Sequence, residues 1–447
     1  MKQTGVTCYI FPGASHHRFE HSIGVSILAN KLISSIKQRQ PELGVSERDV
    51  RCVTLAGLCH DLGHGPFSHA FEDWLRRRHI DFHHEDMSLR MMDLLIDENS
   101  IEIEEDDVKL IKSLIVGQPI SGRNAHLEDA AWLYDIVNNK RNSIDVDKWD
   151  YLARDCYNLG MKRSYDFSRL MMNSRVIGDE ICFHAKEAYN IYEMFHTRYS
   201  LFKQVYSHRV GKAIEYMIGD AFDLADEHLG ISQSLKDPRD YCTLTDCLLR
   251  QIEISKDPNL VPSQKIIQRL RRRDLYKMAE EVILNPGSSD LEITPQLIVN
   301  HSFAFSDEEH FIDTQSVLLD SFTCNYAMKD KNPVDGVHFF SKWDDTSSFP
   351  IEKEKVSLLI PNTFSERYLR IYCKQSHQVS VAQKSFRAAL QSLGKDSPSP
   401  GPAHFIPHKL MRTKTPPYFS SVYHKRERNN SSLSDESYPS KKPKNSD

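Results

Sequence analysis

The feature that most constrains this chain is a predicted helix end that carries metal-ligand side chains, His60 and Asp61, within residues 56–69. Apolar residues at helical spacing, among them Val50 and Val53, predict a buried helix that runs into the pair. Glycines and a proline shortly after the pair predict the end of that helix. A buried carboxylate beside an imidazole needs a partner, because an unpaired buried charge is costly. A metal ion is such a partner, since imidazole nitrogen and carboxylate oxygen are common metal ligands.

The His-Asp pair alone is weak support, because a hydrogen-bonded histidine at a helix end is the more frequent situation. Two further residues strengthen the metal hypothesis: His21, in an amphipathic helix expected over 18–38, and Asp147, in the segment 144–151. Ligands on three separate helices predict a site inside a helical bundle. Two histidines and two carboxylates suit a divalent iron, zinc, manganese or nickel ion, with coordination positions left for water and substrate.

Composition limits the class of protein. The chain has 447 residues and a net charge of -5, so no overall attraction to nucleic acid or membrane is expected. Nine cysteines are scattered without a C-x-x-C pattern, which favours reduced thiols in the nucleus or cytoplasm. We expect no contact with a membrane, because no apolar run is long enough to span one.

Periodicity predicts a mostly α fold, an α-helical bundle with a smaller α+β lobe. Helices are expected over 18–38, 47–62, 68–78, 84–97, 105–116, 129–138, 144–158, 166–173, 186–228, 243–254 and 262–272. Strands are expected at 316–319, 337–340, 356–360 and 367–372, followed by a closing helix over 381–393. We expect a catalytic domain over 1–285, an α+β lobe over 286–394 and a disordered tail, rich in Ser, Pro, Lys and Asn, over 395–447.

Several longer blocks carry a family resemblance, at 11–16, 18–22, 40–43, 46–49, 56–69, 140–142, 144–151, 194–198 and 331–333. In these blocks the chain resembles the HD-domain metal phosphohydrolases. It is most similar to those that join a sterile-alpha-motif domain to the HD domain and hydrolyse deoxynucleoside triphosphates (dNTPs). The resemblance runs from about residue 3 to about residue 390 and implies hydrolysis of dNTPs to deoxynucleoside and inorganic triphosphate.

The resemblance implies a role for each residue of the site. The metal ligands would be His21, His60, Asp61 and Asp147, with Mg²⁺ accompanying the nucleotide. His69 would be the general acid at the 5′ oxygen, His84 would match the catalytic histidine, and His64 would touch the α-phosphate. Glu72 stands where the family has an aspartate behind the general acid, with Asp73 as a substitute. His83 is expected to be a surface neighbour of His84.

Substrate-binding positions are also implied by the resemblance: Gln3, Thr4, Arg18, His64, His69, Lys148, Tyr151, Asp155, Arg198 and Tyr206. Arg18 would hold a phosphate and Arg198 the γ-phosphate, while Tyr206 would pack under the sugar and select deoxyribose. Gln3 and Asp155 would bind the 3′-hydroxyl. Thr4 and Ser207 depart from the family pattern near the base and the sugar. The spacing of 147, 148, 151 and 155 places them on one helical face, although an ordinary ion-paired face with Asp150 and Arg154 explains that spacing equally well.

The family is activated by GTP or dGTP together with a dNTP bound between subunits, so the resemblance implies a dimer that becomes a tetramer with nucleotide. Matching positions of the dNTP effector site are Ile10, Arg169, Lys186, Asn190, His208, Arg209 and Val210, whereas Asn173 and His184 depart from it. The sterile-alpha-motif domain and most of the first activator site would precede Met1. We therefore expect weak or altered activation by GTP.

Two alternatives compete with a dNTP triphosphohydrolase: an HD phosphodiesterase or nuclease acting on nucleic-acid ends or cyclic nucleotides, and a nucleotide- or RNA-binding regulator with impaired catalysis. Basic clusters at 76–78 and 271–273 are compatible with single-stranded nucleic acid, although a solvated helix face explains them more simply. The lysine-rich segment 440–444 is compatible with nuclear import. The resemblance further implies control of the dNTP pool, restriction of viral reverse transcription as an antiviral defence in innate immunity, and a link to DNA repair.

Overall fold

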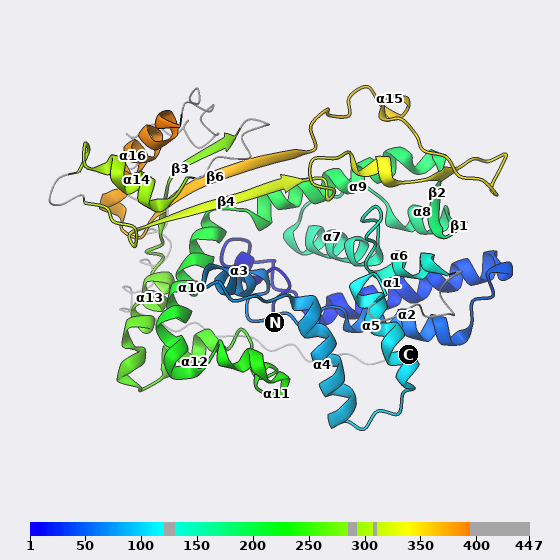
Figure 1. The fold of residues 1–447 in the computed structure, drawn as a ribbon, viewed down its shortest axis with the longest axis horizontal. Helices are drawn as coiled ribbons and strands as arrows, with labels where there is room; N and C mark the ends of the chain where they lie inside the picture. The colour runs from blue at the N-terminus through cyan, green and yellow to red at the C-terminus, as the bar shows by residue number, and fades with distance from the viewer. Residues whose placement is uncertain (120–129, 285–292, 307–310, 394–447) are drawn as a thin grey trace, which may run out of the picture. The chain divides into compact units, whose positions relative to one another are not determined.

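The structure, a computed structural model, describes residues 1–119, 130–284, 293–306 and 311–393. Within these ranges the chain is mostly helical with small sheets, which confirms the expected fold class (Figure 1). A search of the described helices finds none with the length and apolarity that a membrane crossing requires.

The helices that build the site share one hydrophobic core. Helix α1 (Arg18–Arg39) packs along α2 (Glu47–Cys59), and both contact α6 (Tyr134–Val137). Helix α1 also packs against α7 (Val146–Leu159), and α2 against α5 (Glu105–Val116). The buried stripe of α1 recurs at helical spacing through Val25, Leu28, Leu32 and Ile36. The pairs α1–α2 and α1–α7 therefore bring the three predicted ligand segments together.

Capping side chains fix where two of these helices begin. Ser46 accepts a hydrogen bond from the backbone of Asp49 at the start of α2, and the Asp49 carboxylate accepts one in return from the backbone of Ser46. Asp145 caps α7 by accepting from the backbone of Lys148. Helix α7 ends at Gly160, whose φ of 67° suits a residue without a Cβ atom.

A second core cluster joins α3 (His69–Arg77), α10 (Arg209–Leu229) and α13 (Val261–Arg271). Helices α11 (Pro238–Tyr241) and α12 (Leu248–Ile254) also belong to this cluster, and α4 (His84–Glu98) contributes to both clusters. Helices α8 (Phe167–Met172) and α9 (Ala188–Leu201) belong to the first. Helix α3 is amphipathic, with Phe71, Trp74 and Leu75 buried. This burial holds the helix that begins at His69.

Two three-stranded sheets accompany the helices within the described ranges. One has the antiparallel order β3 (Lys277–Leu284), β6 (Ser365–Cys373), β4 (Val317–Asn325), and α16 (Val379–Ser392) contacts β3, β6 and α14 (Pro295–Ser302) (Figure 1). The other joins β1 (Ser174–Ile177), β2 (Glu180–His184) and the short β5 (Phe339–Phe340). Strand β3 lies before residue 285 and pairs with β6, which lies after residue 285. The expected domain boundary at 285 stays a prediction.

The single helix expected over 186–228 is wrong. Helix α9 ends at Leu201, a π-helical turn follows over Phe202–Tyr206, and α10 begins at Arg209. The break falls at His208, whose extended backbone and side chain, which accepts from the backbone of Val210, start a new helix. The apolar periodicity continues across this break, so periodicity alone did not show it.

The strand expected at 356–360 is also wrong. The segment follows α15 (Lys353–Val356) as a turn, and Leu358 and Leu359 are exposed. Strands β1, β2 and β3 and helix α14 were not expected from the sequence. The strands near 317–325, 339–340 and 365–373 and the closing helix are confirmed. The expected tail over 395–447, with its lysine-rich segment, lies outside the described residues.

Candidate metal centre and active site

The predicted metal ligands converge. One ligand atom each from His21, His60 and Asp61 lies within 4.8 Å of the others. Asp147 Oδ1 lies 3.1 Å from His21 Nε2 and 3.5 Å from His60 Nε2. Helix α1, the end of α2 and the first turn of α7 supply these side chains, as a site inside a helical bundle requires.

The histidines are oriented for a cation. His60 Nδ1 donates to the Gly57 carbonyl at 2.9 Å, while its Nε2 is buried without a hydrogen-bond partner. His21 Nδ1 donates to Asp150 Oδ2 at 2.8 Å, so its Nε2 faces Asp61 and Asp147. A second hydrogen bond of this kind fixes the ring of a metal-ligating histidine. Two imidazoles and two carboxylates, together with the buried Nε2 of His60 that has no hydrogen-bond partner, fit a divalent metal ion.

Charges concentrate strongly here. Burial lowers the pKa of His21, but hydrogen bonds to Asp147 and Asp150 and the charge of Asp61 together raise it to about 10. Burial raises the pKa of Asp61, yet the Arg18 and His60 charges hold it well below its usual range. At both ligands the effect of opposite charges on the pKa therefore outweighs the effect of burial. The proton on His21 neutralises part of the negative charge of the nearby carboxylates, as a divalent cation would.

Arg18 lies buried against the same carboxylate. Its Nη1 donates to Asp61 Oδ2, its Nε donates to Ser68 Oγ at 3.1 Å, and its Nη2 donates to the Gln3 carbonyl at 3.3 Å. The Oε1 atom of Gln3 and the hydroxyl of Thr4 are buried without partners. The structure thus joins the predicted phosphate arginine to Asp61 and to the segment of the predicted 3′-hydroxyl ligand.

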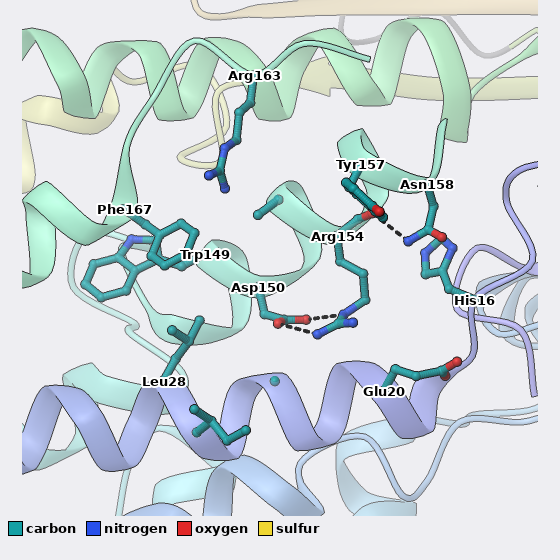
Figure 2. Close-up of a pocket in the computed structure, with 13 residues that line it drawn as sticks. His16, Glu20, Leu28, Trp149, Asp150, Arg154, Tyr157, Asn158, Arg163 and Phe167 are labelled. Atoms are coloured by element: carbon teal, nitrogen blue, oxygen red, sulfur yellow. Dashed lines mark hydrogen bonds and ion pairs between the residues drawn. The ribbon is translucent and has the colours of Figure 1, made fainter. Parts of the chain in front are cut away.

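A layer of contacts between α1 and α7 supports the metal ligands (Figure 2). Arg154 holds Asp150 through two hydrogen bonds of 2.8 Å, and Asp150 in turn holds His21. Gly24 permits this approach, because a Cβ atom there would lie 2.0 Å from Asp150 Oδ1. His16 Nε2 donates to Asp155 Oδ1 at 2.6 Å. Asp150, Arg154, Gly24 and His16 also line a cavity of about 530 Å³ that is bordered by side chains of both α1 and α7.

The predicted catalytic residues form a second group beside the first. Glu72 accepts from His69 Nδ1 at 2.8 Å through Oε2 and from His84 Nδ1 at 2.6 Å through Oε1. His64 stacks on His84 with ring centroids 3.9 Å apart, and its Nε2 lies 3.4 Å from Asp61 Oδ1. Burial lowers the pKa of His84, but the hydrogen bond and charge of Glu72 raise it overall. A protonated His84 held by a carboxylate is able to donate a proton.

Backbone strain and close packing fix this second group. Phe67 and Ser68, between His64 and His69, both have positive φ values, of 61° and 58°. Non-glycine residues in this conformation often mark functional sites. Gly63 lies so near α4 that a Cβ atom would approach the His84 carbonyl to 2.0 Å. His83 is exposed and lies 3.5 Å from Asp81, whereas Asp73 pairs with Arg76 and Lys212.

The predicted sugar residues meet at one carboxylate. Tyr206, at the end of the π-helical turn, donates to Asp155 Oδ2 at 2.5 Å, and His16 holds the other oxygen. The predicted phosphate cations, Lys148 and Arg198, have other hydrogen-bond partners. Lys148 contacts Asp145 at 3.2 Å, and Arg198 donates to the Asn325 carbonyl at 2.6 Å. The charges of Arg198 and Lys148 both lower the pKa of Tyr151, although burial raises it overall, so the charges of both cations act on one side chain.

The predicted effector residues fall into two groups. The first surrounds the buried Glu187, which accepts hydrogen bonds from Arg169 and Asn190 at 2.8 and 2.9 Å. Lys186 lies next to Glu187 in sequence and donates its backbone N–H to His184 Nδ1. The second group, Ile10, His208, Arg209 and Val210, lies at the start of α10, with the Ile10 side chain 3.4 Å from a Cβ atom placed on Gly211.

The basic clusters are engaged in ion pairs. Arg76 pairs with Asp73 at 2.7 Å, Arg78 contacts Asp226 at 2.5 Å, and Arg271 contacts Glu253 at 3.1 Å. Arg273 donates to the Tyr9 carbonyl at 3.0 Å. These contacts partly neutralise the clusters, and binding of nucleic acid there stays a prediction.

Sequence reasoning missed residues that act behind the ligands, chiefly Asp150 and His16. Asp150 was considered only as a member of an ion-paired face. A usable signal was present, because Asp150 lies three residues after Asp147 and so on the same side of α7. His16 carried no signal of its own, since its partner Asp155 is 139 residues away.

Comparisons with known proteins agree with this geometry. Residues 18–155 match the HD domain, and residues 165–396 match the HD associated region. A Dictyostelium discoideum protein named "Deoxynucleoside triphosphate triphosphohydrolase SAMHD1 homolog" is 48% identical over 399 residues, which are 88% of this chain and 75% of that protein. The SAMHD1 proteins of Bos taurus and Homo sapiens are each 39% identical, over 85% and 88% of this chain and 71% and 67% of their own lengths.

Proposed function

Because this chain belongs to the HD-domain family that includes the SAMHD1 deoxynucleoside triphosphate triphosphohydrolases, we propose that it hydrolyses dNTPs to deoxynucleoside and inorganic triphosphate. The observation that carries the proposal is the convergence of His21, His60 and Asp61, with Asp147 against both histidines. A divalent ion held by these four residues would lower the pKa of a water molecule and polarise the phosphate. Iron, zinc or manganese is our choice for that ion, with Mg²⁺ entering on the nucleotide.

Phosphate contact and proton transfer are assigned to the side chains next to the metal ligands. His64, buried and 3.4 Å from Asp61, places an imidazole beside the α-phosphate. His69 donates a proton to the 5′ oxygen of the leaving deoxynucleoside, and the exposed ring of His69 is held by Glu72. His84 shares the same carboxylate, so one glutamate orients two proton-carrying groups.

Substrate recognition is assigned to three basic side chains and to the Asp155–Tyr206 pair. Lys148 and Arg198 bind the outer phosphates, and Arg18 exchanges part of its contact with Asp61 for a phosphate oxygen. Asp155 accepts from the 3′-hydroxyl, and Tyr206 closes the space that a 2′-hydroxyl would need. Gln3 donates its side-chain amide N–H to the oxygen of the same hydroxyl, and Thr4 faces the base.

A product assay tests the activity. The purified chain is incubated with dGTP, with a cyclic nucleotide or with single-stranded RNA, in Mn²⁺ or Mg²⁺, and the products are separated by ion-exchange chromatography. We expect inorganic triphosphate and deoxyguanosine from dGTP alone. Release of pyrophosphate, cleavage of the cyclic nucleotide or shortening of the RNA would instead support a phosphodiesterase or nuclease. Nucleotide or RNA binding without any product would support a regulator with impaired catalysis.

Regulation and location complete the proposal. The groups around Glu187 and at the start of α10 bind a dNTP effector between subunits, nucleotide converts a dimer to a tetramer, and activation by GTP or dGTP is weak or altered. Sedimentation with and without GTP and a dNTP tests this assembly, and a sedimentation coefficient unchanged by nucleotide would contradict it. Nuclear or cytoplasmic location, single-stranded nucleic-acid binding, and roles in antiviral defence and DNA repair follow from the family alone and are part of the same proposal.

A further inference from the structure

The group formed by His64, His69, Glu72 and His84 has the composition of a metal site in its own right. Each residue offers one ligand atom, and these four atoms lie within 4.8 Å of one another. The cation site described above uses none of them. The proposed function uses these four side chains for proton transfer and for contact with the α-phosphate, and their arrangement also suits a metal ion.

The distances are already close to those of a coordination sphere. The two oxygens of Glu72 lie 2.8 Å from His69 Nδ1 and 2.6 Å from His84 Nδ1. Ligand atoms about 2 Å from a tetrahedral ion lie roughly 3.3 Å apart, so an ion would replace the shared protons after a small outward movement. His64 stacks on His84 at 3.9 Å and meets His69 edge to edge at 4.9 Å between centroids. The third imidazole thus already lies within reach of the same point.

One nitrogen of the group lacks a hydrogen bond. His64 is buried, and its Nδ1 has no hydrogen-bond partner. A buried polar atom without a partner costs about 1–3 kcal/mol, and a coordinated ion would satisfy it. This orphan atom is an observation independent of the Glu72 contacts.

The backbone holds the group in place before any ion binds. The Ser88 hydroxyl donates to the His60 carbonyl at 2.7 Å and accepts from the Gly63 N–H at 2.8 Å, which joins α4 to the loop that carries His64. The backbone of Phe67 donates to Asp246 Oδ1 at 2.8 Å, which fixes the turn before His69. A constellation held by such contacts loses little entropy when it binds a ligand.

The donor set selects the ion. Three imidazoles and one carboxylate are typical of zinc, which is most often tetrahedral. Mg²⁺ prefers oxygen ligands in an octahedral arrangement and would find one carboxylate here. We propose that His64, His69, Glu72 and His84 form a second, inhibitory zinc site, separate from the cation site at His21, His60, Asp61 and Asp147. Zinc coordinated to one nitrogen of each ring prevents His69 and His84 from taking up a second proton, so neither can act as an imidazolium acid.

Zinc stoichiometry tests the binding directly. The full-length chain is stripped with a chelator, dialysed against buffered Zn²⁺ and analysed by plasma mass spectrometry. We expect Glu72→Gln and His84→Ala to bind about one zinc ion fewer than the unmodified chain. The matched control is His83→Ala, which removes an exposed histidine next in sequence, and we expect it to bind as much zinc as the unmodified chain. Equal zinc content in all four proteins would overturn the proposal.

Cobalt spectroscopy locates the ion and excludes misfolding as an explanation. In a His60→Ala background, which weakens the first site, added Co²⁺ is expected to give the visible absorption of a tetrahedral centre. Adding Glu72→Gln should abolish that absorption while the circular dichroism spectrum stays unchanged. Retained absorption in the double variant would contradict the assignment, and so would its absence in the His60→Ala chain.

The inhibitory consequence rests on the proposed function, whereas zinc binding does not. In an assay with Mn²⁺, we expect added Zn²⁺ to lower triphosphate release at least tenfold, and excess Mg²⁺ at the same ionic strength to have no such effect. If no dNTP is hydrolysed under any condition, the proposed function fails and the stoichiometry still decides the zinc site. If dNTPs are hydrolysed and saturating zinc does not slow the reaction, the inhibitory role is wrong.

Discussion

The two histidine groups of this protein lie side by side but are built differently. The first draws its ligands from α1, the end of α2 and α7, and His21 and His60 are fully or nearly buried. The second comes from the single stretch 64–84, and the side chain of His69 is 68% exposed. Asp61 touches both groups, through His21 and through His64.

This difference separates two demands on an active site. A cation that polarises phosphate must be held rigidly, and ligands from three packed helices provide that rigidity. A proton donor must approach the substrate and exchange protons with water, and the exposed side chain of His69 permits this. We therefore expect mutations in the first group to affect metal content and activity together, and mutations in the second to affect activity while the first cation is retained.

The largest effect is expected from His60→Ala. The substitution removes the buried Nε2 that faces Asp147 and Asp61. We expect triphosphate release to fall at least ~10³-fold, equivalent to about 4 kcal/mol of transition-state stabilisation, with loss of metal from protein purified without chelators. His83→Ala is the control for a histidine outside both groups. Full activity in a variant that holds no metal in the first group would contradict the role assigned to that group.

Glu72→Gln should cost less, because it leaves the first cation in place. The amide cannot accept from both imidazoles as a carboxylate does, so we expect turnover to fall about 10²–10³-fold, within the range of general acid catalysis. The metal held by His21, His60, Asp61 and Asp147 should be retained in protein purified without chelators, even though the variant cannot bind the second zinc ion. Glu72→Asp sharpens the test, since the shorter carboxylate should reach one histidine and recover part of the rate. Loss of the first metal in Glu72→Gln would show that the groups are not independent.

Asp150→Asn is expected to act through the first group alone. Asp150 accepts from His21 Nδ1 and is held by Arg154. Removing such a partner of a metal ligand typically costs 10–100-fold in metal affinity or activity. The measurement is activity against Mn²⁺ concentration, in which the midpoint should shift to higher metal while turnover at saturation recovers. An unshifted midpoint with reduced turnover would instead give Asp150 a role in the second group.

These groups also show what the sequence can and cannot predict. His21, His60, Asp61 and Asp147 were predictable because chemistry and helical spacing restrict each of them, and the family resemblance made the choice specific. Asp150 and His16 were not, because the role of each depends on which neighbour the fold brings to it. The His16–Asp155 bond joins residues 139 positions apart, and no local pattern contains that information.

The fold shows the same limit. Helices α1, α2 and α7 were predictable from apolar periodicity and capping residues, and they position the first group. The break between α9 and α10 was not, because the apolar period continues through Tyr206 while the backbone passes through a π-helical turn. Strand β3 was missed because Lys277–Leu284 contains strong helix formers, and only pairing with β6 makes it a strand.

The smallest expected effect is on stability and follows from the proton on His21. Its pKa is raised from 6.5 to about 10 by Asp147, Asp150 and Asp61. A raised pKa in the folded state contributes stability that is fully present below pH 6.5 and is lost as pH rises through about 10. The metal-free chain should therefore melt a few degrees lower at pH 10 than at pH 7. In the metal-loaded chain the ion replaces the proton, so the drop should be smaller. The measurement is differential scanning fluorimetry with and without chelator, and equal drops in both samples would show that His21 does not exchange a proton for the cation.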